Sequence, residues 1–428
     1  MKRIIVLALV LGVASVPGAY AGGGFGTGPC TLQAGDVLPG SSGNVLLVPE
    51  EFQTIQGAVD AAAEGDTILV GPGTYHESVQ VRTPGLRIRG TDRNQVVLDG
   101  QYSLRIGIEV ARADRVLIEN MTARGYTNHG FYWFDLTGYW GRYLTAHNNG
   151  LYGIFAFDAR CGELSDSYGW GHRDAGFYIG QCYPCDAVIH NIVSESNALG
   201  YSGTNAGGNL TLRDSLWINN GLGIVPNSLD SEARPPQRGA TIARNRVLEN
   251  NNRTAPGTGT AGTYWGGGIV IAGGQSNSVY GNEVTNHAFG GIVIAPLPDD
   301  NFWIPSGNTI WGNKVTHNAA QYPEAYDLAQ GAVSGPNNCW ADNEFSTSAP
   351  GAIQTIYDCG AMATPPGGSP LIEHALIAGQ AGMNGRVQSP WQTYPGPTTL
   401  YPSQPDDNGN GDYSDDLGPD SWLPALGL

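Results

Sequence analysis

A histidine and two carboxylates are the residues of this sequence whose spacing best suits acid/base chemistry. Glycines that open short apolar runs recur about every 23 residues, so one position in a repeat has a counterpart in the next. His172 and Glu195 are 23 residues apart, and Asp174 lies two residues after His172. In stacked strands such counterparts lie about 5 Å apart. The spacing predicts an acid/base or cation-binding cluster, with a merely exposed polar edge as the open alternative.

Aromatic and polar residues recur in step with the same glycines. Two residues after successive glycines come Tyr132, Phe155 and Tyr178. Side chains alternate across a strand, so this row and its neighbours one residue earlier face opposite ways. If the row faces outward, its rings could stack against sugar rings; if the repeats bend, a loop buries them. Five residues after the glycines comes a polar column, which we expect to bind substrate beside the rings: Asp135, Asp158 and Gln181.

A second edge of the repeats competes for the site. One interval between glycines is 45 residues long, because residues 226–238 and 253–264 are inserted there. Loops that project from a regular scaffold often carry binding residues, although insertions are also simply tolerated at surfaces. The titratable residues of this alternative are Asp230 and Glu232.

The glycine repeat predicts the fold that positions these groups. The repeat glycines are Gly130, Gly153, Gly176, Gly200, Gly223, Gly268 and Gly291. Most of them open a short β-prone apolar or aromatic run, and no helical periodicity persists between them. A fixed period of this length predicts an all-β solenoid, a right-handed parallel β-helix with about 23 residues per coil. The helical spacing of residues 51–63 predicts a capping helix at its open N-terminal end.

Asparagines follow the second strand of each repeat. Stacked in the turns of successive coils, they can hydrogen-bond from coil to coil. We expect this structural role for Asn120, Asn148, Asn197, Asn219, Asn250, Asn286 and Asn318.

Residues 1–21 have the basic start, apolar centre and small-residue end of a secretory signal. We expect a flexible segment at 22–44, the β-helix with its cap at 45–362, and a Pro-, Gly- and Asp-rich tail at 363–428. No other stretch is long and apolar enough to span a membrane. The chain is therefore expected to be secreted, periplasmic or on the cell surface.

The net charge of −17 becomes −19 without the two cations of the signal. Such an acidic chain should attract neither nucleic acid nor an anionic membrane. Residues 406–412 of the tail fit the first half of a calcium loop, but Leu417 stands where a bidentate glutamate is needed. We expect a solvated acidic tail, with calcium as the remaining alternative, no other metal site and no required cofactor.

Six cysteines in an exported chain make disulfides possible. Cys182 and Cys185 are expected to close a turn, and Cys339 and Cys359 to join adjacent coils. Cys161 and Cys185 could also stack one coil apart, so the pairing of Cys30 and Cys161 stays open.

Residues 49–77 resemble the N-terminal cap of secreted right-handed β-helix proteins, a group that includes pectin-lyase-like folds, pectin methylesterases and NosD-like proteins. The run from Gly176 to Cys185, with segments 200–205 and 224–228, resembles bacterial exported β-helix proteins without an assigned activity. The resemblance covers roughly residues 46–350. It implies the fold, which many chemistries share.

The sequence lacks the motifs of the enzymatic branches, including the Asn-Thr-Asp and Gly-His-Gly of polygalacturonases and the Asp-Pro-His-Asp of alginate epimerases. We expect an exported protein that binds or acts on a polysaccharide or cell-surface glycan. If it is an enzyme, it is expected to be a polysaccharide lyase or glycoside hydrolase. The alternatives are a non-catalytic adhesion scaffold and a NosD-like maturation factor for a periplasmic metalloprotein.

Overall fold

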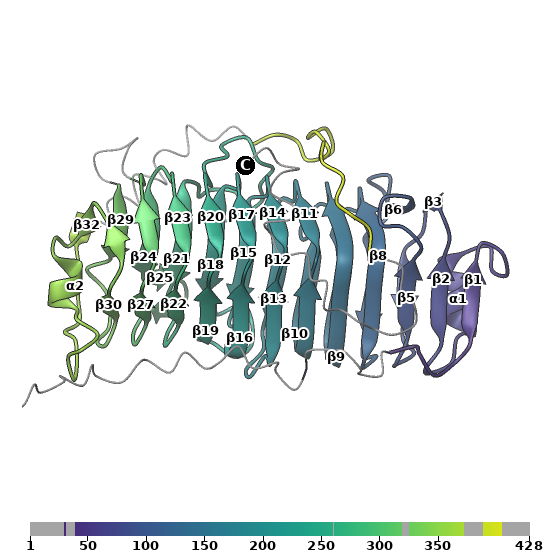
Figure 1. Cartoon of the computed structure of the whole chain (residues 1–428), viewed down its shortest axis with the longest axis horizontal. Coiled ribbons are helices and arrows are strands. Elements are labelled where there is room, and N and C mark those ends of the chain that lie inside the picture. Colours follow the sequence, from purple (N-terminus) through teal and green to yellow (C-terminus); the bar gives the residue numbers. More distant parts are fainter. Residues whose placement is uncertain (1–29, 31–38, 260, 319–324, 372–387, 405–428) are drawn as a thin grey trace, which may run out of the picture.

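The chain winds into a parallel β-helix (Figure 1). A computed structural model describes residues 30, 39–259, 261–318, 325–371 and 388–404. Within these residues one sheet holds 30 strands, and its strand pairs are parallel. The only antiparallel pair among them is a small hairpin, β25 (Leu297–Pro298) with β26 (Phe302–Trp303). The predicted fold class is confirmed.

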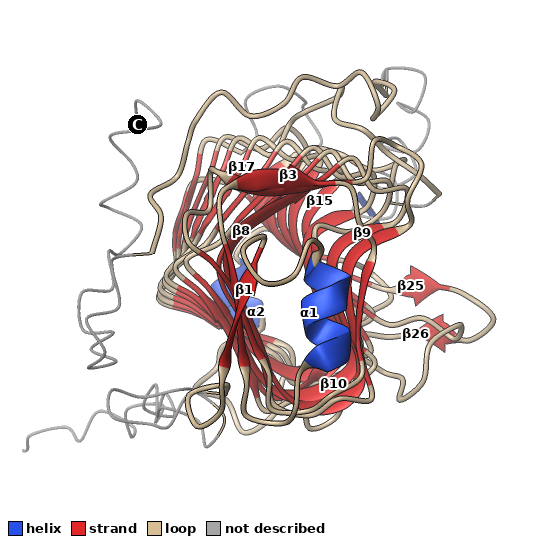
Figure 2. Cartoon of the chain, turned by 90° about the vertical axis from the view of Figure 1, so that its right-hand side faces the viewer, coloured by secondary structure: helices blue, strands red, loops and turns tan. Residues whose placement is uncertain are grey.

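Each coil contributes to three faces, seen end-on in Figure 2. Face 1 carries the strands that contain or follow the repeat glycines. Two of these strands are long: β10 continues from face 1 into face 2, and β9 continues through face 2 into face 3. Its strands are β4 (Val79–Val81), β7 (Ile106–Ala111), β9 (His129–His147), β10 (Ile154–Ser165), β12 (Ala175–Gly180), β15 (Leu199–Thr204), β18 (Leu222–Asn227), β21 (Gly267–Ala272), β24 (Gly290–Ala295), β29 (Tyr326–Gln330) and β32 (Ser348–Ala349).

Faces 2 and 3 close the coil. Face 2 adds β1 (Val45–Val48), β2 (Thr67–Val70), β5 (Arg87–Gly90), β8 (Val116–Arg124), β13 (Ala187–His190), β16 (Gly207–Arg213), β19 (Arg238–Ala243), β22 (Ser278–Tyr280), β27 (Thr309–Trp311) and β30 (Cys339–Ala341). Face 3 adds β3 (Gly73–Tyr75), β6 (Val96–Asp99), β11 (Tyr168–Trp170), β14 (Val193–Glu195), β17 (Leu216–Ile218), β20 (Arg246–Leu248), β23 (Glu283–Thr285), β28 (Lys314–Thr316) and β31 (Glu344–Phe345).

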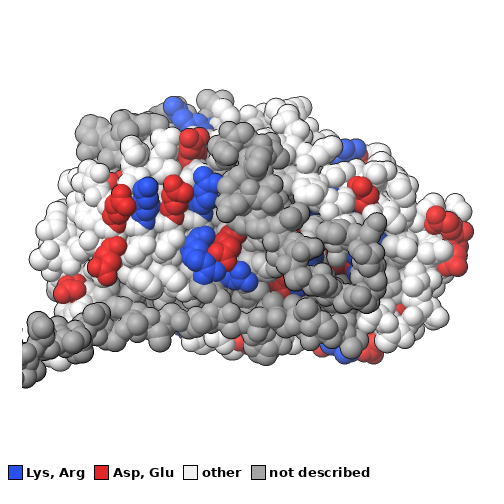
Figure 3. All heavy atoms as spheres, in the orientation of Figure 1, with Lys and Arg blue, Asp and Glu red and all other residues white. Residues whose placement is uncertain are grey.

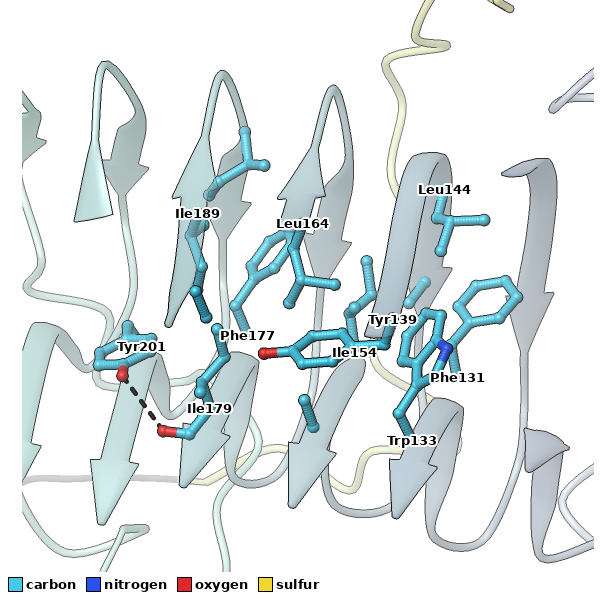
Figure 4. Packing of buried hydrophobic residues seen from close by; sticks show 14 of the residues in the cluster. Phe131, Trp133, Tyr139, Leu144, Ile154, Leu164, Phe177, Ile179, Ile189 and Tyr201 are labelled. Atoms are coloured by element: carbon cyan, nitrogen blue, oxygen red, sulfur yellow. Dashed lines mark hydrogen bonds between the residues drawn. The ribbon is translucent and has the colours of Figure 1, made fainter. Parts of the chain in front are cut away.

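Register decides which side chains enter the core. Phe131, Ile154 and Phe177 stand opposite one another on face 1 and are fully buried (Figure 4). Tyr201 continues the row, and its hydroxyl donates to the Ile179 carbonyl oxygen at 3.2 Å. The row one residue after the repeat glycines is therefore the inner one. Strand alternation turns the next row, with Tyr132, outward.

The same register appears as alternating charge on the outside of face 3. Glu283 stands opposite Arg246 on one side and Lys314 on the other, and Glu344 follows Lys314. Figure 3 shows this row of alternating sign across the C-terminal half of the molecule. Alternation avoids like charges directly opposite one another across neighbouring strands.

Helix α1 (Ile55–Ala61) covers the N-terminal end of the coil, as predicted, but it is shorter than residues 51–63 (Figure 2). The Thr54 hydroxyl accepts from Gly57 N–H, and the Glu77 carboxylate accepts from Ile55 and Gln56 N–H. These bonds occupy backbone donors that the first turn of a helix leaves free. At the other end lies the short α2 (Ile353–Ile356).

Buried amide side chains form ladders along the turns between faces. In the turn from face 3 to face 1, the Asn220 Oδ1 accepts from both the backbone N–H and the side-chain amide of Asn197, at 2.9 and 3.0 Å. This ladder consists of Asn149, His172, Asn197, Asn220, Asn250, His287, Asn318 and Asp327. Two further ladders run through the other turns: Asn245, Asn282, Asn313 and Asn343, and Gln237, Asn277, Asn308 and Asn338.

The predicted asparagines occupy two neighbouring positions of the turn. Asn148, Asn219 and Asn286 stand one residue before the ladder, where their φ angles of 51°, 54° and 61° are left-handed. Asparagine tolerates this conformation better than most residues, so it recurs there for a second reason. The following residue builds the ladder. The side-chain amides of Asn219 and Asn286 still bond from coil to coil as predicted, donating to Ser196 Oγ at 3.1 Å and Glu249 Oε1 at 3.3 Å.

Three disulfides tie the described residues together. The structure joins Cys182 to Cys185 and Cys339 to Cys359, the pairs that the spacing favours, and joins Cys30 to Cys161. The predicted signal at 1–21 and the calcium-like run 406–412 lie outside the described residues. Among the residues that are described, no helix is long and apolar enough to cross a membrane.

Part of the predicted C-terminal tail packs against the coils. Residues 388–404 form a strap, visible in yellow in Figure 1. The Asn148 side-chain amide donates to the Tyr394 carbonyl oxygen at 2.8 Å, and Arg93 donates to that of Pro402 at 3.0 Å. Tyr401 is almost fully buried. This part of the tail is therefore ordered by side-chain contacts with the coils.

The ladder can be tested by an isosteric change. Asn220→Asp keeps the shape but replaces a buried amide donor by a carboxylate facing Asn250 Oδ1. We expect the free energy of unfolding to fall by about 2 kcal/mol or more at neutral pH. The same change at exposed Asn337 is the matched control and should leave it within about 0.5 kcal/mol. Urea unfolding followed by circular dichroism measures both, and equal effects would contradict the role of the ladder.

Candidate functional site

Aromatic rings stack on the outer side of face 1 near the middle of the molecule. The Tyr132 and Phe155 ring centroids are 4.8 Å apart with an interplanar angle of 17°, and Tyr178 meets Phe155 edge-on at 4.7 Å. Tyr152, in the turn before β10, lies parallel to Phe155 at 4.4 Å. The register pairs β9, β10 and β12 residue by residue, so the predicted row does form.

The row is less accessible than a flat sugar-binding platform. Tyr178 and Phe155 are only 1% and 6% exposed, while Tyr132 is half-buried. Because Tyr132 and Phe155 stack on one another, they cover each other's faces. Half-buried Phe134 and Phe157 stack in the same way at 6.2 Å. The accessible apolar surface therefore consists mainly of ring edges.

The predicted polar column lies in the turn between faces 1 and 2. Asp135, Asp158 and Gln181 all have left-handed φ angles, which short polar residues tolerate. Their side chains hold neighbouring groups: Asp135 pairs with Arg112 at 2.8 Å and Asp158 with Arg234 at 3.3 Å. Gln181 Oε1 accepts from Ala233 N–H at 2.8 Å. Two members of the column therefore anchor the inserted loop.

His172 occupies a ladder position inside the coil. Its Nδ1 accepts from Asn149 N–H at 3.2 Å, and its Nε2 donates to the Ala146 carbonyl oxygen at 3.1 Å. The side chain is fully buried, and burial lowers its pKa to about 3. The prediction of His172 as an acid/base group is corrected, because both ring nitrogens are engaged by the backbone.

Glu195 lies away from His172 on the outside of face 3. It accepts a hydrogen bond from the Tyr168 hydroxyl at 3.0 Å, and Tyr168 packs against Tyr401 of the strap with ring centroids 4.1 Å apart. Burial raises the pKa of Glu195 to about 7. The structure therefore separates the predicted pair, because the coil is 25 residues long at this point. Glu195 stands opposite Trp170, and the ladder neighbour of His172 is Asn197.

Asp174 and Glu232 are brought together on face 1. The Tyr178 hydroxyl donates to Glu232 Oε2 at 2.5 Å, and Tyr152 lies near enough to Asp174 to affect the pKa of that carboxyl. The rings of Tyr152 and Tyr178 lie 4.9 Å apart. Burial raises the pKa of each carboxyl to about 7, and the negative charge of Asp174 raises that of Glu232 further.

Each of these two carboxyls can bind or release a proton near neutral pH. Nearby acids that titrate close to pH 7 lose their protons one after the other, so one can hold a proton while its neighbour is ionised. That is the arrangement which general acid/base catalysis requires. Glu232 belongs to the alternative site that the sequence analysis placed on the inserted loops. The loop brings Glu232 to face 1, where it contacts Tyr178.

Sequence reasoning missed two aromatic members of this cluster. Tyr152 and His129 each stand directly before a repeat glycine. The His129 ring lies 5.5 Å from Tyr152 and 4.7 Å from Phe155, and burial lowers its pKa to about 3. His129 is therefore neutral at ordinary pH. Their shared position before the glycines was the signal that could have found them.

No group of three or more His, Cys, Asp or Glu side chains is arranged to hold a metal ion in the described part of the chain. The cluster of Asp174, Glu232, Tyr152 and Tyr178 is the candidate site, and we call it the face 1 site.

The ladder role of His172 leads to a stability test. His172→Asn places the usual ladder residue there, and its amide can still accept from Asn149 N–H. We expect it to retain stability within about 1 kcal/mol, whereas His172→Ala should lose about 2 kcal/mol or more, because it leaves buried backbone groups without partners. Thermal unfolding of both variants measures the difference, and equal losses would argue against a hydrogen-bonding role.

Comparison with known proteins identifies the fold. No protein-family model and no curated protein sequence matches the chain. Among solved structures, the A-module of Azotobacter vinelandii mannuronan C-5 epimerase AlgE4 is similar at a TM-score of 0.51 and 14% identity, over 69% of this chain and 91% of that one. An alginate lyase from Paenibacillus sp. is similar at 0.48 and 13%, over 71% and 99%. At 14% identity the likeness to the epimerase module shows a shared parallel β-helix fold.

Proposed function

We propose that this chain is an exported protein that acts on a polysaccharide by proton transfer at the face 1 site. The observation that carries the proposal is the pair Asp174 and Glu232 beside the stacked rings of Tyr152 and Tyr178, with Glu232 accepting from the Tyr178 hydroxyl at 2.5 Å. Burial raises the pKa of each carboxyl to about 7. Strongly shifted carboxyls with specific partners are common at catalytic sites.

The chemistry of polysaccharides suits such a pair. Hydrolysis of a glycosidic bond needs an acid to protonate the leaving oxygen and a carboxylate to act as base or nucleophile. Elimination from a uronic acid unit needs a base to remove the C5 proton and an acid for the same leaving oxygen. Both reactions therefore need one protonated and one ionised group, which Asp174 and Glu232 would supply near pH 7.

The surroundings of the site favour a sugar polymer as substrate. The ring edges of Tyr132, Phe134 and Phe157 offer apolar contact to the C–H groups of sugars, and the Asp135–Arg112 pair beside them offers hydrogen bonds to hydroxyls. An extended row of this kind fits a chain of repeating units.

Two further observations support the class of function. One protein that shares the fold at a TM-score above 0.5 is named a mannuronan C-5 epimerase, an enzyme of a polysaccharide. Three disulfides among the described residues suit a protein outside the reducing cytosol. The shared fold supports a glycan partner, and the disulfides support export. The experiment below identifies the particular glycan.

A panel of neutral and uronic polysaccharides incubated with the mature protein tests the proposal. Reducing ends report hydrolysis, absorbance of unsaturated products reports elimination, and proton NMR reports epimerisation. We expect turnover of one substrate, and a loss of about 10²-fold or more in Asp174→Asn and Glu232→Gln. A pH profile with limbs near 7 should flatten in either variant.

Glu195→Gln is the matched control. Glu195 also has a tyrosine partner and a pKa raised to about 7, but it lies under the strap on face 3. We expect it to keep wild-type turnover. If Glu195→Gln were inactive while Glu232→Gln stayed active, the site would be on face 3. No turnover or binding of any glycan in the panel would reject the proposed function.

A further inference from the structure

The inserted loop at residues 229–236 is fixed along its length. At its base, Gln237 N–H donates to the buried Ser228 hydroxyl at 3.0 Å. Further along, the Asp230 carboxylate accepts from Asn301 N–H at 2.6 Å, in the hairpin of β25 and β26 that projects from the coils in Figure 2. The loop is therefore a fixed wall beside the face 1 site.

Two successive members of the polar column hold the loop on either side of Glu232. The Gln181 Oε1 accepts from the N–H of Ala233, the residue after Glu232, at 2.8 Å. Asn205 continues the column in the next coil, because it also stands five residues after a repeat glycine. Its side chain contacts the loop at Glu232 and before it.

Asn205 makes three hydrogen bonds with the loop backbone. Its side-chain amide donates to the carbonyl oxygens of Leu229 and Glu232 at 2.7 and 2.9 Å, and its Oδ1 accepts from Leu229 N–H at 3.1 Å. The side chain is only 1% exposed. An amide combines two donor hydrogens with an acceptor, so one buried side chain joins both ends of residues 229–232.

We propose that Asn205 is a positioning residue that fixes the Glu232 carboxyl against Tyr178 before substrate binds. The inference rests on the proposed function and adds to it a residue that acts only through Glu232. Asn205 fixes the backbone of Glu232, and the Tyr178 hydroxyl then fixes its Oε2 at 2.5 Å. An acid/base group that is held in place in advance needs no ordering during the reaction.

The origin of Glu232 explains why it needs such a residue. Asp174 comes from the regular turn before β12, so the register of the coils sets its place. Glu232 comes from an insertion and meets Tyr178 across 54 residues of sequence, so the register does not set its place. A shift of about 1 Å in a catalytic group can cost about 10²-fold in rate.

Two variants remove the bonds without introducing a charge. Asn205 has a left-handed φ of 49°, which glycine adopts without strain, so Asn205→Gly removes only the side chain. Asn205→Ser is the second variant, for the case that the first does not fold. Serine already occupies left-handed positions in this chain at Ser196 and Ser276. Its single O–H cannot donate to both carbonyl oxygens.

A carboxyl titration reports the position of Glu232 without any glycan. Carbon-13 NMR follows the labelled glutamate carboxyls, and Glu232→Gln identifies the signal. Burial raises the pKa of Glu232 to about 7 in the intact protein. We expect it to fall toward its ordinary 4.5 in Asn205→Gly and Asn205→Ser, because a released loop lets water reach the carboxyl.

Turnover separates the loss of position from the loss of binding. On the polysaccharide that the panel identifies, we expect kcat of Asn205→Gly to fall about 10- to 100-fold. We expect KM to stay within about threefold, because proton transfer acts in the transition state and not in substrate binding.

Asn191→Gly is the matched control. Asn191 is also buried, has a left-handed φ of 52°, and donates from its amide to Asp166 in the turn between faces 2 and 3. We expect this variant to lower the midpoint of thermal unfolding about as much as Asn205→Gly. It should keep the wild-type kcat and the wild-type titration of Glu232.

A wild-type titration of Glu232 in both Asn205 variants would overturn the inference, as would an equal loss of kcat in Asn191→Gly. The outcome is separable from that of the proposed function. A shifted titration in a protein that neither binds nor turns over any glycan would keep Asn205 as the residue that places Glu232 and reject the function. Turnover with wild-type kcat and titration in both Asn205 variants would do the opposite.

Discussion

The coil-to-coil hydrogen bond of the buried amide ladders is the interaction on which this structure depends. Each turn has a backbone N–H that faces the neighbouring coil and is closed off from water, and a buried donor without a partner costs about 1–3 kcal/mol. The Asn220 side chain meets this demand for Asn197, and Asn250 does so for Asn220. Because each amide also bonds the next amide, the ladder holds the coils in one register. Outward residues at equivalent positions must then stack as well.

That stacking brings distant residues to the face 1 site. Tyr152 and Tyr178 come from successive coils, so their rings are neighbours by register alone. Glu232 arrives differently, because its loop folds back over earlier coils and meets Tyr178 across 54 residues of sequence. A regular scaffold can thus fix one half of a site rigidly while an insertion supplies the other half. Binding and catalytic residues are often carried by loops that a rigid scaffold positions.

The sequence allowed the fold and the register to be predicted, but not which side chains meet. Glycine spacing placed Tyr132, Phe155 and Tyr178 in one row because a 23-residue period leaves a single register. It failed at His172, since the coil there is 25 residues long, so Asn197 rather than Glu195 is the counterpart of His172. Histidine can also serve as a ladder residue as well as a base. It also failed at Glu232, because the path of an irregular loop follows no period. The rings were predicted to form either an exposed sugar-binding platform or a buried cluster. Tyr178 and Phe155 are buried, whereas Tyr132 is half-buried.

Two tyrosine–carboxyl pairs show why a shifted pKa does not identify a site by itself. Glu195 with Tyr168 and Glu232 with Tyr178 have similar partners, similar burial and a pKa near 7. Glu195 is covered by the strap, whose Tyr401 packs on Tyr168. Glu232 is covered by its own loop, which is held by polar contacts, and a second titrating carboxyl, Asp174, faces it. One carboxyl can only release or bind a proton, whereas two that share a field can hold opposite protonation states at one pH. The second carboxyl is therefore what distinguishes face 1 as the place for proton-transfer chemistry.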